Sequence, residues 1–193
     1  RIEDTDKDRN PEESYEGMLG AIHWRCLDWD EGPGKGGPHP PYRQSERFET
    51  YREHAERLVA AGSAYPCFCT KERLEALREA QRKAKVAHAL GYDGHCRAIP
   101  PEEGRRRREA GESHVLRLAM PREGETIVAD LLRGELRFDN TLIDDQVLVK
   151  SDGYPTYHLA NVVDDHLMGI THVIRAEEWI SSLPKHAVLY GGF

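Results

Sequence analysis

The chain is 193 residues long, with 38% hydrophobic and 32% charged residues and a formal net charge of −7. This composition excludes a disordered tail and predicts a globular protein with a core divided between two lobes. No apolar run approaches the roughly 20 residues of a membrane helix, and no basic-then-apolar leader opens the chain, so the sequence predicts a soluble protein without a membrane partner. The negative charge argues against wholesale coating by nucleic acid but is compatible with a local basic groove.

The first segment, Arg-Ile-Glu-Asp-Thr-Asp, reads as a short apolar strand end followed by acidic residues. It begins without a methionine and in the middle of a strand-to-loop passage, which predicts a piece of a longer polypeptide. A helix should follow, with Asn10 as its N-cap, Pro11 at its first position and Glu13 completing the start signal. Apolar residues at helical spacing predict one buried stripe on it: Tyr15, Met18, Leu19 and Ile22.

Residues 30–42 are too rich in glycine and proline for a helix or a strand, so they should form a loop. This loop is either a plain connector or the rim of an active site. From Ser45 a second helix should run to about Ala61. Its predicted inner face comprises Phe48, Tyr51, Ala55, Leu58 and Val59.

The pattern changes after Tyr65. A third, highly charged helix should begin just after Cys69, and the Glu- and Arg-rich segment 100–112 follows. Its run Arg105–Arg108 is read as a solvated helix face, with a phosphate-contacting patch as the alternative. Strands are predicted at 115–120, 126–129, 134–138 and 147–149. Strands and charged helices between flanking α/β segments predict an α+β insertion over 65–145 in a domain made of 1–64 and 146–193.

Three of the four cysteines predict a zinc site. Cys67 and Cys69 form a C-x-C pair and Cys96 follows, which supplies three soft ligands, and Tyr92 or His95 would complete a tetrahedron. A closed site of this kind stabilises structure and does not activate water. The alternative is three small buried residues without a metal. The isolated Cys26 is expected to be packed, and because this pattern is unlike a secreted disulfide framework we expect a reduced, cytoplasmic setting.

The segment 150–179 is organised like a binding site. On a helix, Tyr157 and Asn161 project from one face, and Arg175 should emerge at the end of a short strand over 171–174. A phenol, an amide and a guanidinium could then converge on one small polar ligand. Walker, G-x-G-x-x-G and G-x-S-x-G motifs do not occur. A triad or metal site made of Asp164, Asp165 and His166 is disfavoured, because adjacent residues of a helix point apart.

Several motifs resemble those of bacterial glutamyl-tRNA synthetases, in order and across essentially the whole chain. They are RIEDTD, DWDEGP, PYRQSERF, AYPCFC, YDGHCR, the long SDGYPTYHLANVVDDHLMGITHVIRAEEW and the closing segment 184–190. The resemblance implies a Rossmann-type class I synthetase catalytic domain, interrupted by an insertion that binds the acceptor stem of tRNA. This agrees with the insertion predicted from composition.

The resemblance also implies a reaction and its site. Glutamate would be activated by ATP with Mg²⁺ to glutamyl-adenylate and then transferred to tRNA(Glu), by a monomer that needs no covalent nucleophile. Arg175 would hold the substrate's side-chain carboxylate, and Glu3 would meet its ammonium group. Tyr157 and Asn161 would add hydrogen bonds. The ATP site would be bordered by Glu178 and Trp179.

The sequence also departs from the family pattern. The HIGH-type and KMSKS-like signatures that bind ATP do not occur in it, which predicts that this chain alone has little or no aminoacylation activity. Two alternatives to a glutamate–tRNA ligase remain. One is a paralogue that glutamylates queuosine in tRNA(Asp), and the other is a non-catalytic module that binds tRNA or a protein.

Overall fold

A computed structural model describes residues 1–5, 12–84 and 91–193, with the backbone alone for 12–14. Six α-helices and five strands are formed by these residues. The helices are α1 (Glu12–Trp24), α2 (Phe48–Ala60), α3 (Lys71–Lys83), α4 (Pro101–Glu109), α5 (Tyr157–Leu167) and α6 (Leu183–Tyr190). The strands are β1 (Ala64–Cys67), β2 (Val115–Leu118), β3 (Glu125–Asp130), β4 (Gly134–Asp139) and β5 (Val147–Val149). In this part of the chain, no helix is long and apolar enough to cross a membrane.

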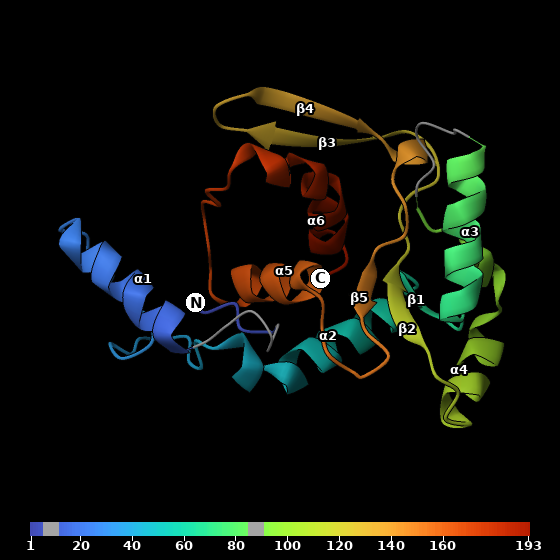
Figure 1. The fold of residues 1–193 in the computed structure, drawn as a ribbon, viewed down its shortest axis with the longest axis horizontal. Coiled ribbons are helices and arrows are strands. Elements are labelled where there is room, and N and C mark those ends of the chain that lie inside the picture. Colours follow the sequence, from blue (N-terminus) through green and yellow to red (C-terminus); the bar gives the residue numbers. More distant parts are fainter. Residues whose placement is uncertain (6–11, 85–90) are drawn as a thin grey trace.

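The core lies where α2, α5 and α6 meet the sheet β1-β2-β5 (Figure 1). The predicted inner face of α2 is confirmed, since Tyr51, Ala55 and Leu58 are buried and Phe48 and Val59 pack against the same cluster. Burial of such a face on the far side of the helix from its charged residues is what the helical period produces. The remaining core side chains come from strands and from the last two helices: Ala64, Leu116, Leu118, Met120, Leu148, Leu159, Ala160, Val162, Val163 and Leu189.

The two sheets are antiparallel. β2 lies between β1 and β5, with Ala64 opposite Leu118 and Leu116 opposite Val149, while β3 and β4 form a separate hairpin. The four strands predicted between residues 115 and 149 are therefore confirmed. The single parallel pairing among the described residues is a bridge between Ile2 and Arg43. A parallel Rossmann sheet is thus not displayed by this part of the chain.

The predicted strand over 171–174 is wrong. These residues run between α5 and the 3₁₀ helix Glu177–Ser182 without forming a ladder, and Ile174 is 94% exposed. A strand needs a neighbour to accept its backbone hydrogen bonds, and the described residues place no other strand beside it.

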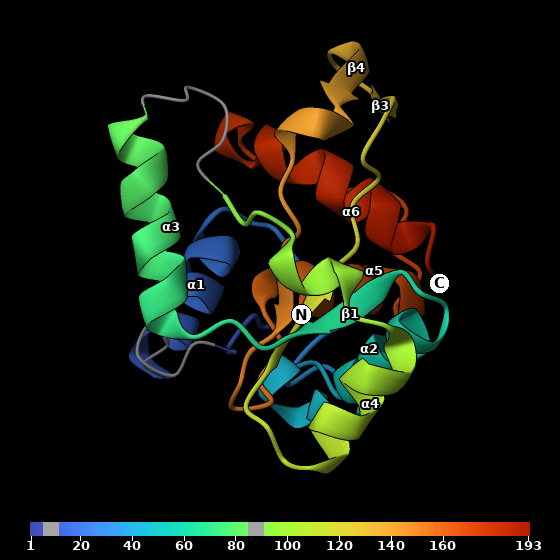
Figure 2. The ribbon, with the colours of Figure 1, turned by 90° about the vertical axis from the view of Figure 1, so that its right-hand side faces the viewer.

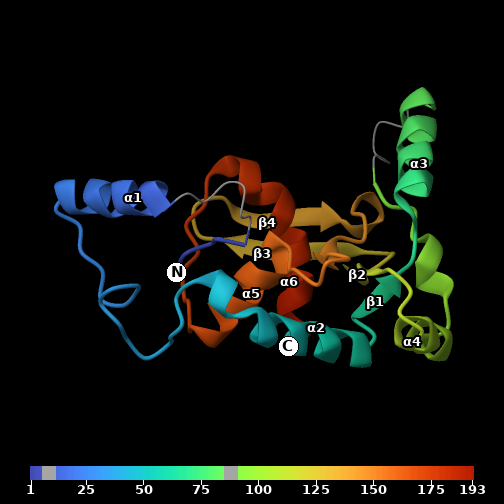
Figure 3. The ribbon, with the colours of Figure 1, turned by 60° about the horizontal axis from the view of Figure 1, so that its bottom comes forward.

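The first helix forms, but its stripe is not buried as predicted. α1 projects away from the other helices (Figures 1 and 3), and Met18 is 46% exposed. Tyr15, Leu19 and Ile22 are only half-buried. The predicted cap residues Asn10 and Pro11 lie outside the described residues. Helical period alone indicates an apolar face, and what covers that face is set by tertiary contacts.

The hairpin β3–β4 lies over α6, as Figure 2 shows from the side. Near its base, the buried carboxylate of Asp145 joins several segments of the predicted insertion. It accepts hydrogen bonds from the Tyr65 hydroxyl (2.5 Å), from the Arg97 guanidinium (3.1 Å) and from the Arg122 guanidinium (3.1 Å). β5, which follows Asp145, pairs with β2 inside the insertion. The boundaries at 65 and 145 remain predictions.

Candidate functional site

Asp164 in α5 holds the start of α2. Its Oδ1 accepts a hydrogen bond from Arg47 Nε (2.7 Å), and its Oδ2 accepts from the Tyr51 hydroxyl (2.8 Å) and from Gln44 Nε2 (3.1 Å). All four side chains are buried. Burial and the charge of Asp164 raise the pKa of the Tyr51 hydroxyl. The first turn of α2 is therefore fixed against α5 by charge-assisted hydrogen bonds.

Asp165, the next residue, holds the N-terminal segment instead. Arg1 donates to Asp165 Oδ1, to Asn161 Oδ1 and, over 3.1 Å, to Glu3 Oε1. Burial alone would lower the pKa of the Arg1 guanidinium, but the bonds and charges of Asp165 and Glu3 outweigh it and raise the pKa. The segment is also tied to residues 42–45, because Ile2 exchanges backbone hydrogen bonds with them.

Arg175 reaches the same place from the other side. One of its terminal nitrogens, Nη2, donates to Asn161 Oδ1 and to Glu3 Oε1, both at 3.0 Å. Its guanidinium carbon lies 5.7 Å from the ring centre of Tyr157 and 5.7 Å from that of Trp179. The structure therefore brings together the four residues predicted to bind glutamate, although the strand expected to carry Arg175 is absent.

The Asn161 side chain is oriented by its neighbours. Its carbonyl oxygen accepts from two guanidinium groups, and its amide nitrogen donates to Asp165 Oδ2 at 3.4 Å. A closed ring of contacts results, running through Glu3, Arg175, Asn161, Asp165 and Arg1. The ring contains two positive and two negative charges and is balanced by itself.

Arg175 is not buried. Its side chain is 31% exposed, close to the 32% of Glu3, whereas that of Arg1 is only 12% exposed. The exposed edge of the ring faces a groove of about 510 Å³, which also borders Asp30, Glu31 and Tyr42 of the loop over 30–42. This placement supports the interpretation of that loop as a rim.

A second, smaller cavity of about 110 Å³ adjoins the groove, and Arg175 lines both. Tyr157, Asn161, Trp179 and His186 contribute to its wall. Trp179 packs on Tyr157 with ring centres 4.7 Å apart. Glu178, in contrast, is exposed and lines neither hollow, so its role beside ATP stays a prediction.

Sequence reasoning missed Arg1, Asp165 and a pair of histidines. Asp165 had a detectable signal, because it continues the four-residue spacing of Tyr157 and Asn161 on one helix face. His158 Nδ1 lies 3.1 Å from His186 Nε2, and burial lowers the pKa of both imidazoles to about 4. His166 lies apart from these groups, exposed and stacked on Phe193.

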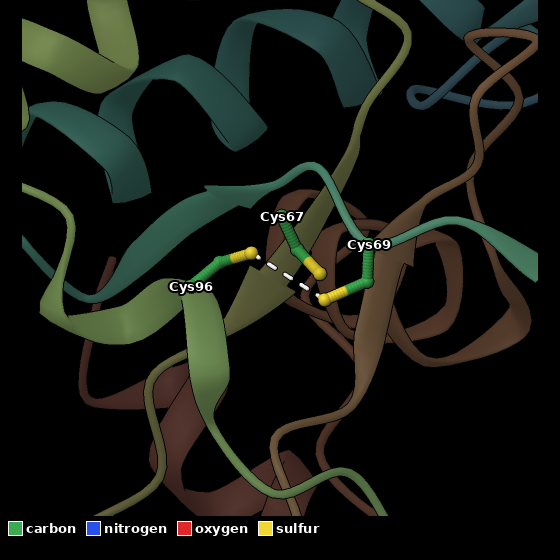
Figure 4. Close-up of side chains that lie close together, drawn as sticks. All are labelled: Cys67, Cys69 and Cys96. Atoms are coloured by element: carbon green, nitrogen blue, oxygen red, sulfur yellow. Dashed lines mark hydrogen bonds between the residues drawn. The ribbon is translucent and has the colours of Figure 1, made fainter. Parts of the chain in front are cut away.

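The three clustered cysteines do converge. The Sγ atoms of Cys67, Cys69 and Cys96 all lie within 4.8 Å of one another (Figure 4). The Tyr92 hydroxyl oxygen lies 3.2 Å from Cys67 Sγ and 3.5 Å from Cys69 Sγ. His95 is exposed, so the geometry favours Tyr92 over His95 as a fourth group.

The surroundings of the cysteine cluster shift the pKa values of its thiols in different directions. Burial raises the pKa of Cys67, but its hydrogen bonds with Tyr92, with the backbone of Cys69 and with Arg117 outweigh burial and lower the pKa overall. Burial raises the pKa of Cys69 to about 11. Cys26, which was expected to be packed, is exposed and has a φ of +55°, so that prediction is wrong.

The arginines of α4 are paired with acids. Arg105 and Arg106 bind Glu102 and Glu103 one turn earlier, and Arg108 reaches Glu56 of α2. Such exposed pairs are typical of a solvated helix face. The solvated interpretation is therefore better supported than a phosphate-contacting patch.

Comparison with known proteins defines the class of the chain. Residues 1–193 match the family described as tRNA synthetases class I (E and Q), catalytic domain. The chain belongs to this family, which confirms the family-level resemblance of its motifs and the α/β class.

Curated relatives named glutamate–tRNA ligase match the whole chain. That of Fusobacterium nucleatum is 58% identical over 193 residues, which are 38% of its length. That of Thermus thermophilus is 55% identical, and the match covers 40% of it. A crystal structure of a glutamate tRNA ligase from Elizabethkingia meningosepticum in complex with its amino acid superposes with a TM-score of 0.90 at 40% identity, covering all of this chain and 39% of that one. The chain thus spans about two fifths of the curated relatives it matches.

Proposed function

We propose that this chain is part of a glutamate–tRNA ligase, which activates glutamate with ATP and transfers it to tRNA(Glu). The observation that carries the proposal is the convergence of Glu3, Tyr157, Asn161 and Arg175 at two adjoining hollows. The names of the relatives support glutamate as the amino acid. They favour the ligase over the two alternatives, the queuosine-glutamylating paralogue and the non-catalytic module.

Each group has a task that its chemistry fits. Arg175 holds the side-chain carboxylate of glutamate, a partner that a guanidinium binds through directional charge-assisted bonds. Glu3 receives the ammonium group. Tyr157 supplies a hydroxyl and a ring beneath Arg175, and Asn161 uses its carbonyl oxygen to orient the guanidinium. No nucleophile from the protein is needed, because the α-carboxylate of glutamate itself attacks the α-phosphate of ATP, and pyrophosphate leaves.

Selectivity against glutamine follows from the charge of Arg175. A neutral amide cannot replace a carboxylate as the partner of a guanidinium, and an unmatched polar group costs on the order of 1–3 kcal/mol when water is excluded. Because Arg175 is about a third exposed among the described residues, we expect the free-energy cost of binding glutamine to lie in the lower part of that range.

The test is to replace Arg175 in the intact protein that contains this chain. Arg175→Ala should abolish glutamate binding measured by calorimetry while leaving the thermal unfolding temperature nearly unchanged, because the side chain is not part of the core. Arg133→Ala is a matched control, since Arg133 is an exposed arginine that also pairs with a glutamate. Unchanged glutamate affinity in Arg175→Ala would refute the assignment.

ATP with Mg²⁺ is the second substrate of the proposed reaction. Glu178 and Trp179 are proposed to border its site. Trp179 lies beside Tyr157 and lines the smaller cavity, which supports the proposal that it borders the nucleotide. Trp179→Phe should therefore raise the KM for ATP more than it raises the Kd of glutamate.

Residues 65–145 are proposed to form the insertion that binds the acceptor stem within a Rossmann-type catalytic domain. The ties between Asp145 and three side chains of this segment support its treatment as one unit. The test is to measure the binding of acceptor minihelices by the intact protein at increasing salt concentration. A steep salt dependence indicates phosphate contacts.

A structural zinc ion is proposed for Cys67, Cys69, Cys96 and Tyr92. Three thiols within 4.8 Å of one another and a phenol in contact with two of them fit a closed four-ligand site. Bound zinc would link the end of β1 to the 3₁₀ helix His95–Ala98. Such a site contributes folding free energy and has no open position for catalysis.

A further inference from the structure

The ion pair between Glu3 and Arg175 occupies the exposed edge of the site. Its two charged atoms are 3.0 Å apart, and each side chain is about a third exposed, at 32% and 31%. Both residues line the groove of about 510 Å³. A ligand entering this groove therefore meets both partners of the pair.

Each member of the pair also has a partner deeper in the ring. Glu3 Oε1 accepts from Arg1 at 3.1 Å, and Arg175 donates to Asn161 at 3.0 Å. Arg1 is in turn held by the buried carboxylate of Asp165. Breaking the Glu3–Arg175 contact would therefore leave both side chains anchored and correctly placed.

Each residue of the pair carries the charge opposite to that of the substrate group it would bind. In the proposed function, which this inference deepens and on which it rests, Glu3 receives an ammonium group and Arg175 receives a carboxylate. We propose that the Glu3–Arg175 pair is an internal stand-in for bound glutamate. When glutamate binds, this one ion pair is replaced by two ion pairs with the substrate. Glu3 takes the place of the substrate's side-chain carboxylate, and Arg175 takes the place of its ammonium.

This exchange makes the site selective for ligands with both charges. A ligand that has a carboxylate but no ammonium separates the pair and offers Glu3 no positive charge to replace Arg175. A ligand with an ammonium and a neutral side chain does the same to Arg175. The pair therefore acts as a competitor that glutamate displaces more readily than either kind of partial analogue.

The probe that tests this is glutarate, which is glutamate without its ammonium group. In Glu3→Asp the shorter side chain keeps the charge but withdraws from Arg175, and in Glu3→Gln the charge is lost. Both variants of the intact protein should bind glutarate about threefold to fivefold more tightly than the wild type, the range of a part-exposed ion pair. Both should bind glutamate more weakly, because its ammonium loses the negative charge of its partner in Glu3→Gln and meets a withdrawn carboxylate in Glu3→Asp.

The control for overall charge is Glu31→Gln. Glu31 borders the same groove, where it accepts a hydrogen bond from Tyr42 at 2.9 Å, and this variant gains the same charge as Glu3→Gln without touching the pair. Its glutarate affinity should stay within about twofold of the wild type. Ligand-observed NMR suits the weak binding of glutarate, calorimetry suits glutamate, and circular dichroism verifies folding.

The outcomes separate the inference from the function beneath it. If the wild type binds glutamate but glutarate affinity is unchanged or lower in both Glu3 variants, the exchange is refuted and the function stands. An equal gain in Glu31→Gln also refutes it, because charge alone would then explain the effect. If the wild type binds no glutamate, the proposed function fails and the inference fails with it.

Discussion

At the residue scale, Asp164 and Asp165 show that adjacent carboxylates of one helix can hold different parts of a molecule. Asp164 faces α2, and Asp165 faces Arg1 and Asn161. Their adjacency in sequence suggests a joint chemical role, but the helix directs their hydrogen bonds to separate partners, and among the described residues only Arg1 lies within ion-pair distance of both. Asp164 and Asp165 therefore hold the site together from both sides and do not carry out its chemistry.

Asp164 should be a major contributor to stability. Asp164→Asn removes a buried charge that three donors share and places an amide N–H against at least one of them, so we expect a loss of about 2–4 kcal/mol in the free energy of unfolding. Urea denaturation measures it. The exposed Asp152→Asn is the control and should change stability by less than about 0.5 kcal/mol. Equal effects of the two changes would contradict the role of Asp164.

The two neutral histidines predict a pH dependence. Their pKa values are about 4 in the folded chain, against roughly 6.5 when unfolded. Between these values the unfolded chain binds more protons, so stability is fully present above pH 6.5 and falls as the pH is lowered towards 4. From pH 7 to pH 5 we expect a loss of about 2–4 kcal/mol for the pair.

Urea denaturation at pH 7 and pH 5 checks this prediction. The double variant His158→Gln with His186→Gln should lose most of the difference between the two pH values, whatever its absolute stability. A double variant with the same pH dependence as the wild type would mean that other groups cause it.

At the element scale, the sequence predicts those helices and strands that depend on residues close to one another in the chain. The strands β3 and β4 and the helix α2 were predicted with nearly correct bounds, because each is decided by local turns and by its own hydrophobic period. The strand over 171–174 and the buried stripe of α1 were wrong, since both require partners far away in sequence.

The candidate site shows the same difference between local patterns and contacts that are distant in sequence. Tyr157 and Asn161 could be placed together from helical spacing, and the C-x-C pair could be seen directly. Arg1 could not be connected to Asp165, because 164 positions separate them and no local pattern encodes such a contact. Orientation of the Asn161 amide likewise depends on two arginines from opposite ends of the chain.

The cysteine cluster carries a prediction about the elements around it. The purified protein should contain about one zinc ion, and a chelator should lower its unfolding temperature by at least about 5 °C, because the site joins β1 to the 3₁₀ helix His95–Ala98. Tyr92→Phe should weaken zinc retention, and the neighbouring change His95→Ala should not. Elemental analysis after dialysis measures both variants, and absence of zinc from the wild type would contradict the proposal.

At the scale of the whole molecule, the chain holds the proposed amino-acid site but lacks the HIGH-type and KMSKS-like sequences. We therefore expect the 193-residue chain alone to show little or no ATP–pyrophosphate exchange, because the stabilisation of the transferring phosphates would be missing. Exchange near the rate of an intact ligase would contradict this. Sedimentation of the same sample would test the predicted monomer.

The ring of contacts around Glu3 has a further consequence, for the order in which the protein is made. Residues 1–3 meet residues 161–175 only after all the residues between them have been synthesised, and closing so long a loop is entropically costly until the segments between have folded. The proposed amino-acid site is thus complete only after Arg175 has been added to the chain. A nascent chain halted before Arg175 leaves the ribosome would contain most of the core described above and an incomplete proposed site, so ligand binding would report that this part of the fold has formed.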